Sequence, residues 1–172
     1  MIKQPISLDA PDLIINELLA VSDAITVVIR NQGNSPVVDA FWVDVYLNPN
    51  PVPNQVNQHW QDLGSQGLVW GVTTVPITPG EVLTLTLTSN TYRPDFSNFV
   101  PPLGAGTVVY GQVDSINLNT TFGGVLEDHE IVGTIYNNIT YTVSTDSSSF
   151  MVRPGHDRML PPAALPLPRR SH

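Results

Sequence analysis

Short segments that alternate between apolar and polar residues constrain this chain more than any other feature. In residues 41–47 (FWVDVYL) the odd-numbered side chains should face a core, and Trp42 and Tyr46 should lie on the opposite face. Comparable segments, rich in β-branched residues and bounded by turn residues, span 12–20, 24–30, 67–75, 81–89, 107–113, 130–136 and 139–143. This pattern predicts an all-β chain folded as an immunoglobulin-like antiparallel β-sandwich of about seven to nine strands.

Long loops and a proline-rich end accompany the predicted strands. Residues 48–66 and 90–106 form two long loops, and five prolines lie in residues 151–172, which should run extended. We therefore predict an N-terminal lead over residues 1–10, a sandwich domain over 11–143 and a Pro-rich extended tail or linker over 144–172. Residues 1–5 show no apolar signal-peptide core, which favours a segment of a longer chain.

The distribution of charge excludes several classes of partner. The net charge is −8, and the basic residues before position 150 are Lys3, Arg30 and Arg93. These are too few to follow a phosphate backbone or to attract the chain to an anionic membrane surface, so we expect no nucleic acid partner. No apolar run reaches the roughly 18 residues of a membrane span, so we expect no membrane insertion. The absence of cysteine excludes disulfides and thiol catalysis. Residues 151–172 carry four arginines and one acid, so a basic tail follows an acidic body.

Several segments together resemble the CARDB family, the cell adhesion related domain found in bacteria. They are PDLII at 11–15, ITVVIRNQGN at 25–34, FWVDVYL at 41–47, VD at 113–114, VLEDHE at 125–130 and NN at 137–138. The loops at 48–66 and 90–106 are longer than in a minimal member, and the spacing from Glu130 to Asn137 is wider. The resemblance implies a seven-stranded sandwich from a bacterial or archaeal exported protein, often repeated in tandem. It implies no ligand.

One group of oxygen-bearing side chains is a candidate Ca²⁺ site. The predicted ligands are Asp114, Glu127, Glu130 and Asn138. Carboxylate and amide oxygens from neighbouring loops suit Ca²⁺. In the alternative interpretation, Asp114 and Asn138 stabilise turns through side-chain to backbone hydrogen bonds, and the glutamates are solvated. His129 is expected to be an exposed loop residue.

Aromatic residues gather in the middle strands and long loops. The candidate contacts with a partner protein or a glycan are Trp42, Tyr46, Trp60, Trp70 and Tyr92. Alternatively, the loop aromatics fold back and hold the two long loops over the sheet as a second small core.

No catalytic motif accompanies these groups, so the sequence predicts a module that is not an enzyme. We expect a structural or adhesion module of a secreted or cell-surface protein, with other protein modules or copies of itself as partners through residues 139–172. The alternative function is a carbohydrate-binding accessory module of a larger extracellular enzyme.

Overall fold

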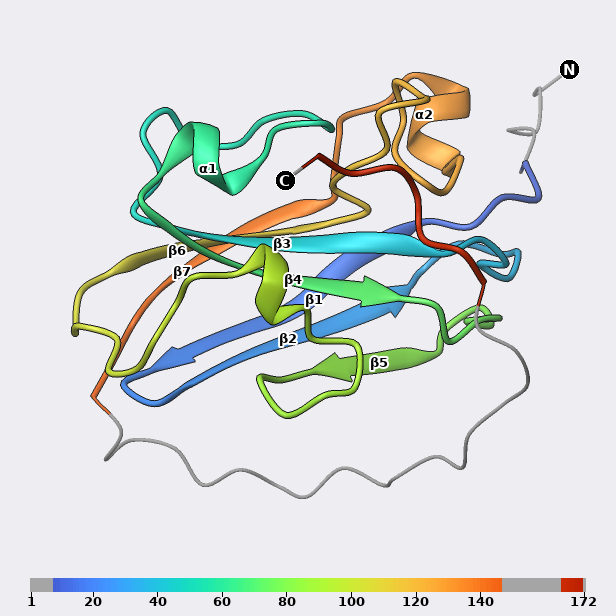
Figure 1. Cartoon of the computed structure of the whole chain (residues 1–172). Coiled ribbons are helices and arrows are strands. Elements are labelled where there is room, and N and C mark those ends of the chain that lie inside the picture. Colours follow the sequence, from blue (N-terminus) through green and yellow to red (C-terminus); the bar gives the residue numbers. More distant parts are fainter. Residues whose placement is uncertain (1–7, 147–164, 172) are drawn as a thin grey trace, which may run out of the picture.

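The computed structural model describes residues 8–146 and 165–171, and it contains two antiparallel sheets packed face to face (Figure 1). The first sheet has the order β1-β2-β5, formed by β1 (Leu13–Val21), β2 (Ala24–Asn31) and β5 (Val82–Leu85). The second has the order β4-β3-β6-β7, formed by β3 (Phe41–Leu47), β4 (Gln66–Val72), β6 (Val108–Val113) and β7 (Ile139–Val143). The predicted immunoglobulin-like sandwich is confirmed.

The prediction of a strand over residues 130–136 was wrong. The chain forms the short helix α2 (Asp128–Val132) there, preceded by a capping box in which Glu127 and Glu130 each accept a backbone N–H of the other residue. Gly133 ends the helix in the left-handed conformation. The alternation in 81–89 also overstated its strand, because β5 ends at Leu85 and a turn follows.

Two further short helices lie in the long loops. Helix α1 (Trp60–Leu63) belongs to the 48–66 loop, and the 3-10 helix η1 (Pro94–Phe96) belongs to the 90–106 loop. Among the described residues, no helix has the length and apolar character that crossing a membrane requires.

The main core lies between the two sheets. Its β3 contribution is the predicted set of odd-numbered residues, Phe41, Val43, Val45 and Leu47, all buried. Trp70 of β4 belongs to the same core. Gly111 of β6 sits where β1 crosses, and an added Cβ there would lie 2.8 Å from Ile15 Cδ1. The sheets can therefore approach closely at this point.

A second, smaller core covers the outer face of the β4-β3-β6-β7 sheet. It contains Trp42, Tyr46, Trp60, Leu63, Val69 and Ile116. Residues 165–171 cross this side of the sandwich, which also carries α1 and α2 (Figure 1). Residues 147–164 of the predicted tail lie outside the described residues, and 165–171 have no helix or strand.

Candidate functional site

A cluster of ionisable side chains lies where the chain enters the sandwich. Asp12 immediately precedes β1, Glu127 is the N-cap of α2, and His129 lies in the helix. One ligand atom from each of these residues lies within 4.8 Å of the other two. Because β1 and α2 are distant in the sequence, only the folded sandwich brings the three groups together.

His129 is buried, with an exposed fraction of 4%, yet neither ring nitrogen has a hydrogen-bond partner. Its Nδ1 lies 3.5 Å from Asp12 Oδ1 and 3.9 Å from Glu127 Oε2, and its Nε2 lies 3.8 Å from Glu130 Oε1. These separations exceed hydrogen-bond lengths. Two ligand atoms of one ion, each bound at about 2.1 Å, are separated by roughly 3.0–3.4 Å. The His129 to Asp12 separation is close to this spacing, and the Glu127 oxygen would have to move inward by about half an ångström to share the same ion.

Amide side chains orient the carboxylates of the cluster. Asn137 Nδ2 donates to Asp12 Oδ1 at 3.0 Å, and Asn138 Nδ2 donates to Glu127 Oε1 at 2.6 Å. The Leu13 backbone N–H donates to the other oxygen of Glu127. The Oδ1 atoms of both asparagines are buried without a hydrogen-bond partner. Such outer contacts fix the direction in which a metal ligand presents its lone pairs.

The pKa values of Glu127 and Asp12 shift in opposite directions. Burial raises the pKa of Glu127 well above its ordinary value, and the neighbouring charge of Asp114 raises it further. Burial also raises the pKa of Asp12, but His129, Asn137 and Gln32 together lower it more, so its net shift is downward. A cation beside Glu127 would favour its ionised form, as metal binding generally does for buried ligands.

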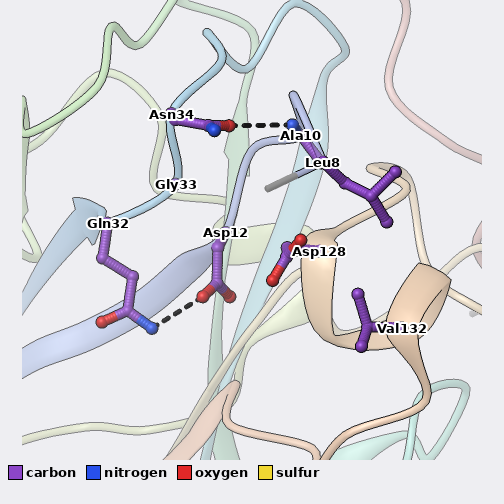
Figure 2. A pocket seen from close by; sticks show the side chains of 8 residues that line it. All are labelled: Leu8, Ala10, Asp12, Gln32, Gly33, Asn34, Asp128 and Val132. Carbon is purple, nitrogen blue, oxygen red and sulfur yellow. Dashed lines mark hydrogen bonds between the residues drawn. The ribbon is translucent and has the colours of Figure 1, made fainter. Parts of the chain in front are cut away.

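A pocket borders this cluster at Asp12 (Figure 2). It has a volume of about 390 Å³ and is lined by Leu8, Ala10, Asp12, Gln32, Gly33, Asn34, Asp128 and Val132. Figure 2 shows Asp12 in this pocket, hydrogen-bonded to Gln32 at 2.7 Å, with the α2 residues Asp128 and Val132 on the other side. Asp12 belongs to both the pocket and the cluster and therefore connects them.

The structure brings together part of the site predicted from the sequence. Glu127 and Asn138 are in contact, and Glu130 lies beside His129. Asp114 has a different environment, because its carboxylate accepts the backbone N–H groups of Gly124 at 2.6 Å and Val125 at 2.9 Å. That arrangement corresponds to the turn-stabilising alternative.

Two members of the cluster were not among the predicted ligands. Asp12 stands 115 positions before Glu127 and no local motif joins them, although Asp12 was visible as the first residue of the predicted strand 12–20. His129 was expected to be exposed, and that expectation was wrong. The Glu127 to Glu130 capping-box spacing was the available signal, because it places His129 in a helical turn.

The predicted contact aromatics lie in two different environments. Trp42, Tyr46 and Trp60 are on the outer sheet face, where the two long loops and residues 165–171 cover them, and Trp60 Nε1 donates to the Phe96 carbonyl at 2.8 Å. Trp70 is fully buried between the sheets, and Tyr92 packs against it with ring centroids 5.6 Å apart. The alternative in which aromatics hold the loops over the sheet describes Trp60 and Phe96.

The outer face also binds the C-terminal residues. Arg170 donates two hydrogen bonds to Asp44, Nη1 to Oδ1 at 2.6 Å and Nη2 to Oδ2 at 2.7 Å. Both side chains are essentially inaccessible to solvent, at 1% and 0% exposed. The guanidinium lies 5.2 Å from the ring centroid of Trp42 and 5.5 Å from that of Phe96. Ser115 Oγ donates a further hydrogen bond to Asp44 Oδ1 at 2.6 Å.

Backbone contacts hold the same segment along the sheet. Trp42 Nε1 donates to the Pro168 carbonyl at 2.7 Å, and the Leu118 N–H donates to the Arg169 carbonyl at 3.2 Å. Leu167 packs on the second core, where the absence of a side chain at Gly71 makes room for it. The outer face is therefore a binding surface for an extended segment that contains a buried arginine side chain.

Comparison with known proteins gives one structural likeness. No family model matches the chain, and no curated protein matches it. A crystal structure of the CARDB domain of a Pyrococcus furiosus protein, solved in complex with di-metal ions, matches over 83% of this chain and 94% of that chain. The chain is similar to a CARDB domain. The sequence identity is 20% and the TM-score is 0.42, and the sandwich itself is established by the strand pairing described above.

Proposed function

We propose that this chain is a non-catalytic structural and adhesion module of a secreted or cell-surface protein, and that its outer sheet face binds an extended, arginine-bearing protein segment. The observation that carries the proposal is the two-point hydrogen bond between Arg170 and the buried Asp44. The remaining contacts of residues 165–171 add shape and direction to this charged pair.

The burial of Asp44 explains why the face is suited to such a segment. Its side chain is 0% exposed, and an unpaired carboxylate in that position would lose its hydration without compensation. Arginine supplies a planar pair of donors that matches a carboxylate, and its flat guanidinium also stacks on aromatic rings. Trp42 and Phe96 flank the guanidinium in this way.

The alternative of a sugar-binding face has less support. Stacking on a sugar needs an open ring face, but Trp60 and Trp70, which the chain's own loops and sheets cover, are 6% and 0% exposed. Trp42 also donates its Nε1–H to the backbone of Pro168. These contacts favour a polypeptide as the ligand of the outer face.

Peptide binding tests the proposal. A fluorescent peptide with the sequence of residues 165–171 should bind the full chain carrying Arg170→Asp, whose own tail no longer pairs with Asp44. Addition of Asp44→Asn to that chain should weaken the binding at least tenfold, because the charged pair is lost. The matched control is Asp62→Asn, on an exposed acid, which should leave binding unchanged. The three chains compared are Arg170→Asp alone, Arg170→Asp with Asp44→Asn, and Arg170→Asp with Asp62→Asn. Equal peptide affinity for all three, or no binding to any, would contradict the proposal.

We further propose that Asp12, Glu127 and His129 hold one divalent cation. The supporting observation is that His129 is buried with both ring nitrogens unpartnered beside two carboxylates. An imidazole ligand suits Zn²⁺ or Mn²⁺ better than Ca²⁺, which takes oxygen ligands. The histidine therefore shifts the expectation from the Ca²⁺ of the sequence prediction toward these metals.

Thermal unfolding of chelator-treated protein tests the cation. Zn²⁺ or Mn²⁺ at a hundredfold excess over Kd should stabilise the chain by about 2.7 kcal/mol, and Ca²⁺ should have a smaller effect. His129→Gln should abolish the response, and Asp128→Asn, on the same helix but outside the cluster, should retain it. Calorimetry should give one ion per chain. An unchanged Tm with every cation, or a full response in His129→Gln, would refute the site.

A further inference from the structure

We infer that residues 165–171, which occupy the outer face of their own sandwich, also bind the outer face of a second copy of this chain, so that copies join tail to face. This inference rests on the proposed function, since it names the partner of the same face. The segment that docks in trans is identical to the one that docks in the structure.

The contacts of the tail do not depend on how it is connected. Every hydrogen bond described for the segment joins one of its residues to the sandwich body, and the charged pair links positions 126 residues apart. Residues 147–164 connect the segment to the body. A second chain can therefore supply the same atoms to the same partners, as in the exchange of an identical element between protomers.

Charge favours the meeting of a tail and a second body. Fourteen of the fifteen acidic residues precede position 150, and four of the seven basic residues follow it. The opposite charges of tail and body accelerate encounter between copies, and the like charges of two acidic bodies disfavour their direct approach. The attraction then ends in one specific contact, in which Asp44 accepts a guanidinium that Trp42 and Phe96 flank.

Shape fixes the register of the incoming segment. Leu167 lies over Gly71 of β4, and a Cβ at that glycine would overlap Leu167 Cδ1. Three positions later Arg170 reaches Asp44, while the Pro168 carbonyl accepts from Trp42. A leucine, a backbone carbonyl and an arginine at fixed spacing therefore identify the tail of this chain as the ligand.

The competition between the two modes depends on concentration. A tethered tail competes at an effective concentration on the order of millimolar. Reciprocal exchange fills both faces in a closed dimer, whereas one-way exchange leaves a free tail and a free face and builds an open row. Exchange should therefore increase where many copies are held close together.

Complementation between two full-length variants tests the inference. Arg170→Asp retains a competent face but has a defective tail, and Gly71→Ala retains a competent tail but has an added Cβ that displaces Leu167 from its own face. Each variant alone should sediment as a monomer, and their mixture should form a one-to-one complex that dissociates at a concentration at least tenfold lower than either self-association. Asp44→Asn serves as a second face-defective partner and guards against misfolding of Gly71→Ala. The control chain carrying both Arg170→Asp and Gly71→Ala should complement neither.

The outcomes separate this inference from the proposed function. A mixed complex that is lost when the Arg170→Asp partner also carries Gly71→Ala supports tail exchange. Binding of the 165–171 peptide without a mixed complex overturns tail exchange and leaves the proposed function standing. Failure of both the peptide and the mixture overturns both.

Discussion

Asp114 links the stability of this fold to pH through one buried carboxyl group. Its side chain is fully buried after β6, and burial raises its pKa to about 8, although the N–H groups of Val125 and Gly124 lower it in part. The folded protein therefore holds a proton on this carboxyl at pH values where the unfolded chain has released it.

Stability should consequently fall as the pH rises. The pKa of Asp114 is about 8 in the folded state and about 3.9 in an unfolded chain, so its contribution is fully present below about pH 4 and is lost through about pH 8. Asp114→Asn should reduce the slope of the free energy of unfolding over this interval. Urea unfolding at several pH values measures that slope. The control Asp62→Asn should keep the wild-type slope, and a parallel profile for Asp114→Asn would contradict the assignment.

At the residue scale, orientation was predictable wherever a strand alternates. The inward and outward sides of β3 were both correct, including Trp42 and Tyr46 on the outer face. His129 was not predictable in this way, because its burial depends on a helix whose signal is a pair of glutamates. The ion-ligand geometry it shares with Asp12 depends on a contact across most of the chain.

At the scale of elements, Trp60 explains how two irregular loops are held. Its ring lies on β4 at Gly67, where an added Cβ would overlap the indole, and its Nε1–H donates to the Phe96 carbonyl in the other loop. One side chain thereby joins α1, β4 and η1. This arrangement follows from the missing side chain at Gly67 as much as from the tryptophan.

Removal of this side chain should loosen both loops. Trp60→Ala should lower the free energy of unfolding by about 3–5 kcal/mol, because a large buried ring is lost. Amide hydrogen exchange should accelerate across residues 48–66 and around Phe96. Trp60→Phe keeps a ring but loses the hydrogen bond, and should have a smaller effect on both measurements. Unchanged exchange in the two loops of Trp60→Ala would refute this role.

Strand existence was easier to predict than element type in the connecting segments. Period-two patterns identified β1, β2, β3, β4, β6 and β7 to within a few residues. In residues 130–136 the apolar residues Ile131, Val132 and Ile135 suggested a strand, but all three are largely exposed and the capping box decides the local structure. A short apolar run contains too little periodicity to distinguish a strand from a short helix.

At the scale of the whole molecule, the sandwich was predictable and the docking of the tail was not. Composition and spacing indicated two stacked sheets, and also indicated a basic extended tail. The sequence did not indicate which acidic residue the tail would bind. Asp44 and Arg170 are 126 positions apart, and the order of the intervening strands brings them together. Alternation placed Asp44 on the outer face but gave no sign of its burial.

Loss of the contacts between residues 165–171 and the sandwich should therefore destabilise the protein locally rather than globally. Breaking an ion pair inside a rigid core typically costs about 3–5 kcal/mol, because the remaining charge stays buried. Here the partner lies on a segment without helix or strand, so Arg170→Met should instead release residues 165–171 and let water reach Asp44. We expect the free energy of unfolding to fall by only about 1–2 kcal/mol, since local release limits the penalty.

The same release should uncover Trp42, whose indole contacts both the guanidinium and the Pro168 carbonyl. Tryptophan emission should shift to the red and acrylamide quenching should increase in Arg170→Met. Arg169→Met is the matched control, because Arg169 is exposed and contributes its backbone carbonyl to the docked segment. Equal quenching in the two variants would mean that the guanidinium of Arg170 does not hold the tail. Greater quenching in Arg170→Met alone would assign the closure of the outer face to the Asp44 pair.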